Sequence, residues 1–326
     1  MDGMPPPQII WDLATAHAVA RCVHVVADLG VADVLDANGA TAEELAVRTG
    51  ANADALGRML RLLAGHGVFA EGPQGYVHTE PSELLRSDHP QSMRRFARMI
   101  GMPVVWNDFT ELAKPATTGE PALNFGELMA YFADHPDEAT IFNQGMAGKS
   151  AGAVTAVIKT HDFTPYSTIA DVGGGHGDLL RAILDTSPSA SGVLFELPHV
   201  VADVGVGSDR LSLAAGDFFA DPLPVADAYV LMEVIHDWPD EKAAKILAAV
   251  RKSAPAHARV LIVEALVTEA PGPHFSKTLD VLMLAITGGR ERTPSEYEAL
   301  LDDAGFRVER IVPTPSRYSI VEATVA

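Results

Sequence analysis

The stretch Asp171–Gly177, DVGGGHG, decides the fold of this chain of 326 residues. It ends the apolar run STIA (167–170) and opens HGDLLRAILDTSP (176–188), whose apolar residues recur at helical spacing. Glycines let a backbone approach a ligand closely, and the amino terminus of a helix offers free N–H groups. We therefore predict a strand, a ligand-binding turn and a helix.

More apolar runs follow this turn, and helical segments separate them. The runs are GVLFELP (192–198), LSLAAGDFF (211–219), DAYVLMEVIHD (227–237) and ARVLIVEALV (258–267). Helices are predicted at DEKAAKILAAVRKSA (240–254) and SEYEALLDDAG (295–305). Strands that alternate with helices form a parallel sheet that binds ligands at the carboxyl ends of its strands. The last runs, on either side of PTPS (313–316), predict an antiparallel hairpin, so the expected fold class is α/β with a Rossmann-like sheet.

The first half of the chain is predicted to be almost wholly helical, up to about Asp162. Thr41 and Glu44 form a capping-box pattern, and Asn52 suits the start of the next helix. FAEGPQGYVHT (69–79) then predicts a two-stranded hairpin, and two helices followed by a hairpin are typical of a winged helix. The predicted helices are 11–35 with a stop at Gly30, 41–50, 52–69, 92–113, 125–135 and 137–160, while KPATTGEPA (114–122) is predicted to be a loop.

The composition argues against several classes of function. Lys and Arg number 24 and Asp and Glu number 43, so the formal net charge is −19. A surface this anionic repels nucleic acid and anionic membranes. The single cysteine, Cys22, excludes a disulfide framework within the chain and a multi-thiolate metal site, and we expect no metal. With no signal-peptide pattern and no run of about 18 apolar residues, we expect a cytoplasmic protein without a membrane span.

The glycine spacing bears on which cofactor the turn binds. Gly173, Gly175 and Gly177 follow the order G-x-G-x-G, whereas a dinucleotide fingerprint needs glycine at position 178, which is Asp178. The observed order is the one seen in S-adenosylmethionine (SAM) sites. SAM has no pyrophosphate, so the turn need not hold one.

Acidic residues at the ends of the next two strands suit the rest of such a cofactor. Glu196, followed by Leu197, lies where a ribose-binding acid is expected, which a NAD-dependent dehydrogenase would also need. Asp217 can accept from the adenine amino group, and Phe218 can pack on the ring. A second acid of this kind is more typical of SAM binders than of dehydrogenases.

His236 lies at the carboxyl end of a central predicted strand, where such sheets perform chemistry. Glu264 ends the next strand between apolar residues, where a charge is costly unless a basic group is near, and His236 is its natural partner. Glu291, in GGRERT (288–293), is a second carboxylate that can converge on the imidazole. These three are the candidate catalytic residues.

Taken together, the motifs resemble those of the plant caffeate-type and related bacterial small-molecule O-methyltransferases. They are FNQGM (142–146), DVGGGHGDLL (171–180), FELPHVV (195–201), GDFF (216–219), HDWPDEKAAKIL (236–247) and GGRERT followed by E-Y (296–297). The resemblance implies that His236 is a general base flanked by Glu264 and Glu291. It also implies that SAM, which leaves as S-adenosylhomocysteine (SAH), is bound at Gly173, Gly175, Glu196, Leu197, Asp217, Phe218 and Met232. Plant members often have Lys at the position of Met232, so backbone or another side chain must replace that amine.

The resemblance further implies a seven-stranded sheet and a helical winged-helix domain that builds a homodimer and contributes to the partner's substrate pocket. The expected boundaries are 1–95 for the dimerisation domain, 96–160 for a helical linker and substrate-pocket region, and 161–326 for the SAM-binding catalytic domain.

Met and aromatic side chains in the second of these regions suit a flat aromatic acceptor, such as a phenolic or quinone-like molecule. The pocket candidates are Trp106, Phe142, Asn143, Met146, Met283 and Ile286. Three alternatives remain. Asp178 and Asp217 argue against a NAD-dependent dehydrogenase, and the intact His236 set argues against a non-catalytic relative. A relative that methylates nitrogen, or uses SAM without methylation, stays open.

Overall fold

The computed structural model of the chain describes residues 3–326. It divides into two compact units that interleave along the sequence. The first unit runs to Asn107 and takes in Phe132–Lys149, whereas the second holds Asp108–Tyr131 and Ser150–Ala326.

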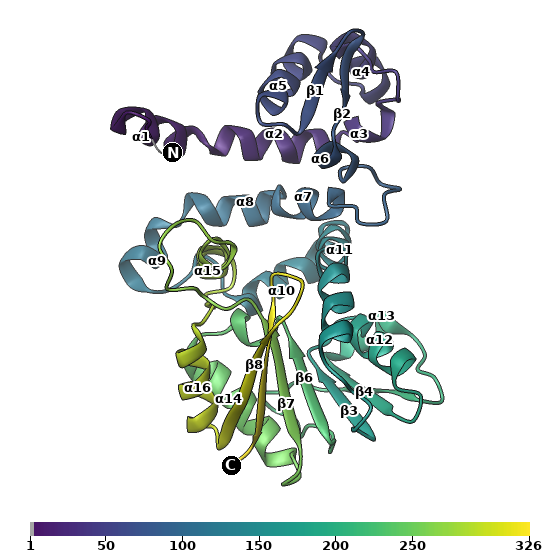
Figure 1. The fold of residues 1–326 in the computed structure, drawn as a ribbon, viewed down its shortest axis with the longest axis vertical. Coiled ribbons are helices and arrows are strands. Elements are labelled where there is room, and N and C mark those ends of the chain that lie inside the picture. Colours follow the sequence, from purple (N-terminus) through teal and green to yellow (C-terminus); the bar gives the residue numbers. More distant parts are fainter. Residues whose placement is uncertain (1–2) are drawn as a thin grey trace. The chain divides into compact units, whose positions relative to one another are not determined.

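The second unit is built around a seven-stranded sheet (Figure 1). The strand order is β5-β4-β3-β6-β7-β9-β8; β3 to β7 pair in parallel, and β9 is antiparallel to β7 and β8. The strands are β3 (Thr168–Val172), β4 (Ser191–Glu196), β5 (Leu211–Ala215), β6 (Ala228–Met232), β7 (Arg259–Glu264), β8 (Phe306–Pro313) and β9 (Ser319–Val325). The predicted Rossmann-like sheet and terminal hairpin are confirmed. The order reverses between β3 and β6, the point at which such sheets bind ligands.

Helices cover both faces of this sheet. Successive residues of a strand point to opposite faces, so one strand contributes side chains to two cores. Tyr229 and Leu231 of β6 pack in one core with α14 and α16, whereas Val230 packs in a second core with α11, α12 and α15. The helices that lie wholly or partly in this unit are α9 (Ala113–Thr118), α10 (Phe125–Asp134), α11 (Pro136–Thr160), α12 (Asp178–Thr186), α13 (Pro198–Val204), the short η1 (Ile235–Asp237), α14 (Asp240–Ser253), α15 (Phe275–Ile286) and α16 (Pro294–Asp303). Burial on both faces explains the near-continuous apolar runs of the strands.

The first unit has the predicted winged-helix order of two helices and a hairpin. The Thr41 hydroxyl accepts from the N–H of Glu44, whose carboxylate accepts from the N–H of Thr41, so the capping box is present. Asn52 caps the following helix. The elements are α1 (Pro6–Thr15), α2 (His17–Asp28), α3 (Val31–Val34), α4 (Ala42–Thr49), α5 (Ala53–Gly65), β1 (Phe69–Gly72), β2 (Gly75–His78), α6 (Glu80–Glu83), α7 (Arg94–Ile100) and α8 (Pro103–Thr110), which ends in the second unit.

Three expectations for the helical half were wrong. The helix predicted at 11–35 is three helices, with Gly30 in the left-handed conformation before α3. The helix predicted at 92–113 breaks into α7 and α8, because Pro103 fits only the first turn of a helix. The loop predicted at 114–122 begins as α9, which tolerates Pro115 near its start and ends where Gly119 turns left-handed.

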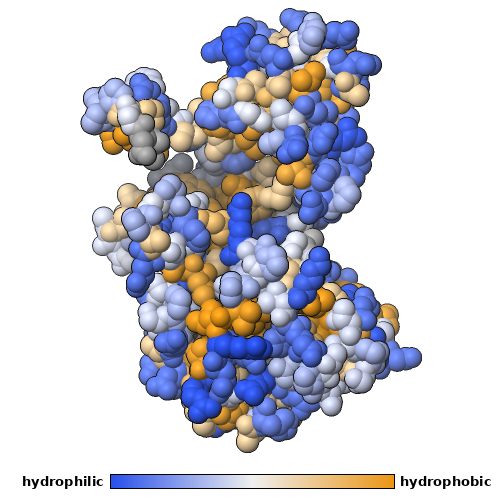
Figure 2. All heavy atoms as spheres, viewed as in Figure 1, coloured by the Kyte–Doolittle hydropathy of each residue, from blue (hydrophilic) through white to orange (hydrophobic). Residues whose placement is uncertain are grey.

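The amino-terminal stretch corrects the expectation that the chain lacks a long apolar segment. By length and composition alone, the 23 residues Pro6–Asp28 could cross a membrane: an 18-residue window within them has a mean hydropathy of 1.3, and 11% of that window is buried. Ile10, Trp11 and Leu13 of α1 are all exposed. Elsewhere, hydrophilic residues cover much of the face seen in Figure 2, as the acidic composition predicts.

Candidate active site

The glycine turn after β3 lies directly against the end of β4. The N–H of Gly173 donates to the carbonyl of Phe195 at 2.9 Å, and the N–H of Gly175 donates to Glu196 Oε1 at 3.3 Å. Both glycines have positive φ, 72° and 58°, a conformation that other residues rarely adopt. The turn and the predicted ribose-binding acid therefore form one site.

Glu196 and Asp217 lie at the ends of neighbouring strands. The second oxygen of Glu196 accepts from the N–H of Leu197, and burial raises the pKa of this carboxyl group. Asp217 follows β5, and its Oδ1 accepts from the N–H of Phe219 at 2.8 Å. Each acid keeps lone pairs for a ligand, because an ionised carboxylate has about four acceptor positions.

Two apolar candidates lie beside the same turn. A Cβ built on Gly173 would lie 3.7 Å from the ring of Phe218, so this ring borders the glycine turn. Met232 ends β6 and is half-buried. All the predicted cofactor residues thus lie at or just beyond the carboxyl ends of the adjacent strands β3, β4, β5 and β6.

Asp171, near the end of β3, borders the glycine turn, and the sequence analysis did not name it as a candidate. Its carboxylate is 1% exposed, and neither oxygen meets a donor at hydrogen-bonding geometry, although the N–H of Leu180 helps to lower its pKa. Burial, together with the neighbouring Glu196, outweighs that effect and raises the pKa to about 7. A buried carboxylate with so few donors around it can accept from a ligand. Asp171 is the first residue of the motif DVGGGHG, and this position could have identified it in the sequence.

His236 lies in η1, just beyond β6, and its side chain is buried. Nδ1 lies 2.6 Å from Glu291 Oε1. Because a carboxylate accepts, Nδ1 carries a proton and the neutral ring presents the lone pair of Nε2. Asp237 Oδ1 lies 3.7 Å from Nε2. Burial alone would lower the pKa of His236, but the carboxylates of Asp237 and Glu291 raise it to about 10.

Glu264 is fully buried at the end of β7, but it bonds to backbone and not to the imidazole that the sequence suggested as its partner. Its Oε1 accepts from the N–H groups of Val234 and His236, at 3.2 and 3.0 Å. Its Oε2 accepts from the hydroxyl of Tyr297. Burial raises the pKa of Glu264 to about 7. Because β7 pairs with β6, the Glu264 side chain reaches the backbone where β6 ends.

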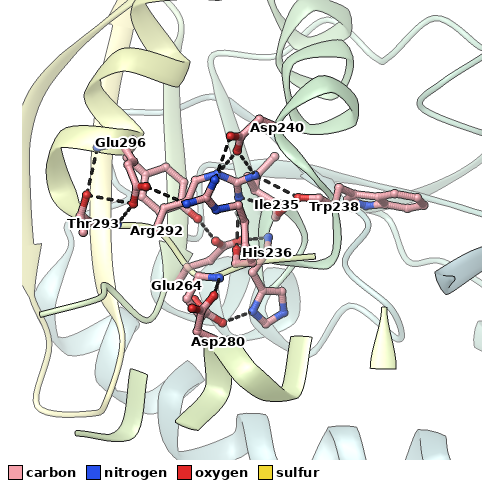
Figure 3. Close-up of polar contacts among 12 residues, drawn as sticks. Ile235, His236, Trp238, Asp240, Glu264, Asp280, Arg292, Thr293 and Glu296 are labelled. Atoms are coloured by element: carbon pink, nitrogen blue, oxygen red, sulfur yellow. Dashed lines mark hydrogen bonds and ion pairs between the residues drawn. The ribbon is translucent and has the colours of Figure 1, made fainter. Parts of the chain in front are cut away.

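The GGRERT loop (288–293) packs on the turn that carries His236. A Cβ on Gly289 would clash with the carbonyl oxygen of His236, so no side chain fits there. The N–H of Arg290 donates to that same oxygen at 2.8 Å. The N–H of Glu291 donates to Asp280 Oδ1 at 2.9 Å, and Figure 3 shows Asp280 close to His236. This packing places the Glu291 carboxylate at Nδ1.

The six candidates for the acceptor pocket divide between the two units. Trp106, Phe142, Asn143 and Met146 belong to the first unit, whereas Met283 and Ile286 of α15 belong to the second. The Trp106 ring meets the edge of His24 at 5.2 Å between ring centroids. Phe142 packs on Phe132 at 4.7 Å. Met283 and Ile286 are 9% and 8% exposed.

Known proteins resemble this chain over nearly its whole length. The model of an O-methyltransferase domain matches residues 109–307, and that of an O-methyltransferase dimerisation domain matches residues 11–88. Phenazine O-methyltransferase PhzM of Lysobacter antibioticus is 39% identical over 332 residues, which cover 98% of this chain and 97% of that protein.

Two other relatives bear on the cofactor and on the atom that is methylated. The solved structure of CalO1, a methyltransferase in calicheamicin biosynthesis in its SAH-bound form, is 36% identical and covers 100% of both chains with a TM-score of 0.88. The 8-amino-8-demethylriboflavin N,N-dimethyltransferase of Streptomyces davaonensis is 32% identical, and the match covers 93% of this chain and 91% of that protein.

Proposed function

Because this chain belongs to the O-methyltransferase family and uses SAM as methyl donor, we propose that it methylates a hydroxyl group of a small aromatic molecule with His236 as general base. The observation that carries the proposal is the 2.6 Å contact between His236 Nδ1 and Glu291 Oε1. It holds the imidazole in the form whose Nε2 can accept a proton.

The residues around the glycine turn fit SAM. When bound, SAM supplies a methyl group made electrophilic by its sulfonium sulfur. Glu196 would accept from the ribose hydroxyls and Asp217 from the adenine amino group. Phe218 would pack on the adenine ring. Asp171, a buried acceptor without a bonded donor, suits the cationic amine of the methionine moiety.

The environment of His236 suits deprotonation of a phenol. A phenol of pKa about 10 and an ordinary histidine of about 6.5 differ by an uphill step of roughly 5 kcal/mol. The carboxylates near His236 raise its pKa to about 10, so proton transfer from the phenol to the neutral imidazole is nearly level. The neutral imidazole becomes the major form only as the pH approaches about 10. Nε2 takes the proton as the acceptor oxygen becomes methylated, and Glu291 stabilises the imidazolium that forms.

A phenolic acceptor is supported by the apolar and aromatic character of the candidate pocket residues and by the phenazine named for the 39% identical relative. Methylation of nitrogen is the second candidate, because one relative is an N,N-dimethyltransferase. Both reactions would use the same base, and the acceptor atom distinguishes them.

Incubation with methyl-labelled SAM and a panel of phenolic acids, aromatic polyketides and hydroxyphenazines tests the proposal. We expect label on an acceptor oxygen, and its loss in His236→Ala while SAH still binds. Label only on nitrogen would favour the second candidate. A variant H236A that turns over as fast as the parent would contradict the role of the histidine.

A homodimer, formed through the first unit, is the proposed assembly. The match to a dimerisation domain and the exposed apolar side chains Ile10, Trp11 and Leu13 support it. On this proposal the apolar stretch Pro6–Asp28 is covered by a second copy of the chain. A cytoplasmic location agrees with such an assembly.

A further inference from the structure

We propose that Tyr297 is a positioning residue that couples two buried side chains of opposite charge, Glu264 and Arg292, which together hold the turn carrying His236. This inference rests on the proposed role of His236 as general base. On this inference Glu264 acts on the backbone of the turn. Tyr297 and Arg292, which lie in quoted sequence motifs but were given no role there, gain a positioning role.

Glu264 holds the amide groups of the turn. Its Oε1 accepts from the N–H of Val234 at 3.2 Å and from the N–H of His236 at 3.0 Å, on either side of Ile235. The side chain is fully buried. Hydrogen bonds to a buried carboxylate are strong, and a shift of Glu264 would move the backbone of His236 with it.

Arg292 holds the carbonyl groups of the same turn. Its side chain is 1% exposed, and it donates to the carbonyl of Ile235 at 3.2 Å and to that of Trp238 at 2.9 Å. Nε and Nη2 also donate to Asp240 Oδ1, at 2.9 and 2.8 Å. Figure 3 shows the guanidinium among these three residues. One planar fork thus spans the backbone on both sides of His236, which lysine could not do.

Tyr297 of α16 contacts both charged groups. Its hydroxyl donates to Glu264 Oε2, the oxygen that does not bond the backbone. The guanidinium carbon of Arg292 lies 5.8 Å from the centre of its ring. The residue is fully buried, and its ring packs in the core with α14. Tyr297 therefore fixes Glu264 from a rigid helix and transmits the packing of that helix to the catalytic turn.

The consequence is a fixed direction for Nε2. Glu291 sets the tautomer of the imidazole, but the position of the ring depends on the backbone of His236. A displacement of about 1 Å in a reacting group can cost about 100-fold in rate. We therefore expect loss of the Tyr297 hydroxyl to lower kcat more than it affects binding.

The test compares Tyr297→Phe with Tyr229→Phe. Tyr229 is an equally buried tyrosine of the same core, but its hydroxyl donates to the carbonyl of Pro224 and accepts from the N–H of Ala226, at the opposite end of β6 from His236. Both variants lose one buried hydroxyl. We expect kcat to fall about 10- to 100-fold in Y297F and less than about 2-fold in Y229F. The affinity for SAH, measured by calorimetry, should change less than about 2-fold in both.

A second readout does not depend on turnover. The Nδ1 proton of His236, bonded to a carboxylate, is expected as a sharp far-downfield signal in the proton NMR spectrum of the SAH-bound parent. It should broaden or shift in Y297F and stay unchanged in Y229F. Equal kcat in Y297F and the parent, with an unchanged signal, would overturn the inference while leaving the role of His236 intact. Full activity in H236A would instead overturn the proposed function.

Discussion

Replacing Glu291 with glutamine should move the pH dependence of catalysis to lower pH. The reaction requires a neutral imidazole at His236. Because the pKa of this side chain is raised to about 10, the imidazole of the parent enzyme is mostly protonated at neutral pH. The logarithm of kcat/KM should then rise with a slope of about one between pH 6 and pH 9.

The expected size of the shift follows from the contact. Glu291→Gln keeps an oxygen that can accept from Nδ1 at the same 2.6 Å position but removes the charge. Loss of an opposite charge at this distance lowers a pKa by about 1–3 units. In E291Q the profile should therefore level off about 1–3 pH units earlier, at a lower plateau because the base is weaker.

The assay is kcat/KM against pH with an acceptor whose hydroxyl does not ionise in the range. Glu298→Gln, which removes one exposed charge from α16, is the control and should leave the profile unchanged. A parent profile that is flat above pH 7, or an identical profile in E291Q, would refute the reasoning about the carboxylates around His236.

Three further changes probe the cofactor site, the catalytic turn and the assembly. Asp171→Asn should weaken SAH binding by about tenfold or more. Without SAH, the same change should raise the free energy of unfolding by up to about 4 kcal/mol at pH 8, because it removes a charge that is costly to bury. Since the pKa of Asp171 is raised to about 7, the parent itself should gain stability as the pH falls from about 7 towards 4. Gly289→Ala should lower the melting temperature and kcat, because its Cβ would meet the carbonyl of His236, whereas Gly65→Ala, with open space around it, should not. Trp11→Glu should convert the dimer to a monomer by light scattering, and an unchanged mass would count against the proposed interface.

The sheet and its site were predictable because they depend on local signals. Apolar runs separated by helices specify a parallel sheet, and the carboxyl ends of neighbouring strands must lie together. Glu196, Asp217 and His236 each come at the end of such a run, so their places at or just beyond the ends of β4, β5 and β6 follow from chain order alone.

Other features depend on contacts between distant residues, which no local pattern contains. Glu264 was expected to pair with the imidazole, but its partners are backbone amides and Tyr297, a residue 33 positions away. The burial of Arg292 is equally invisible in the sequence, since arginine is usually exposed. Asp171 was missed because the sequence does not show that its carboxylate is buried with no donor at hydrogen-bonding geometry.

The most direct test of the central claim compares the parent with His236→Ala on a series of phenols of falling pKa. A general base matters only while the acceptor still holds its proton. The ratio of the two rates should therefore be about 10²–10⁴ for a phenol of pKa about 10 and fall towards one for a phenol that is already ionised at the assay pH. A ratio that stays the same across the series would contradict proton removal by His236.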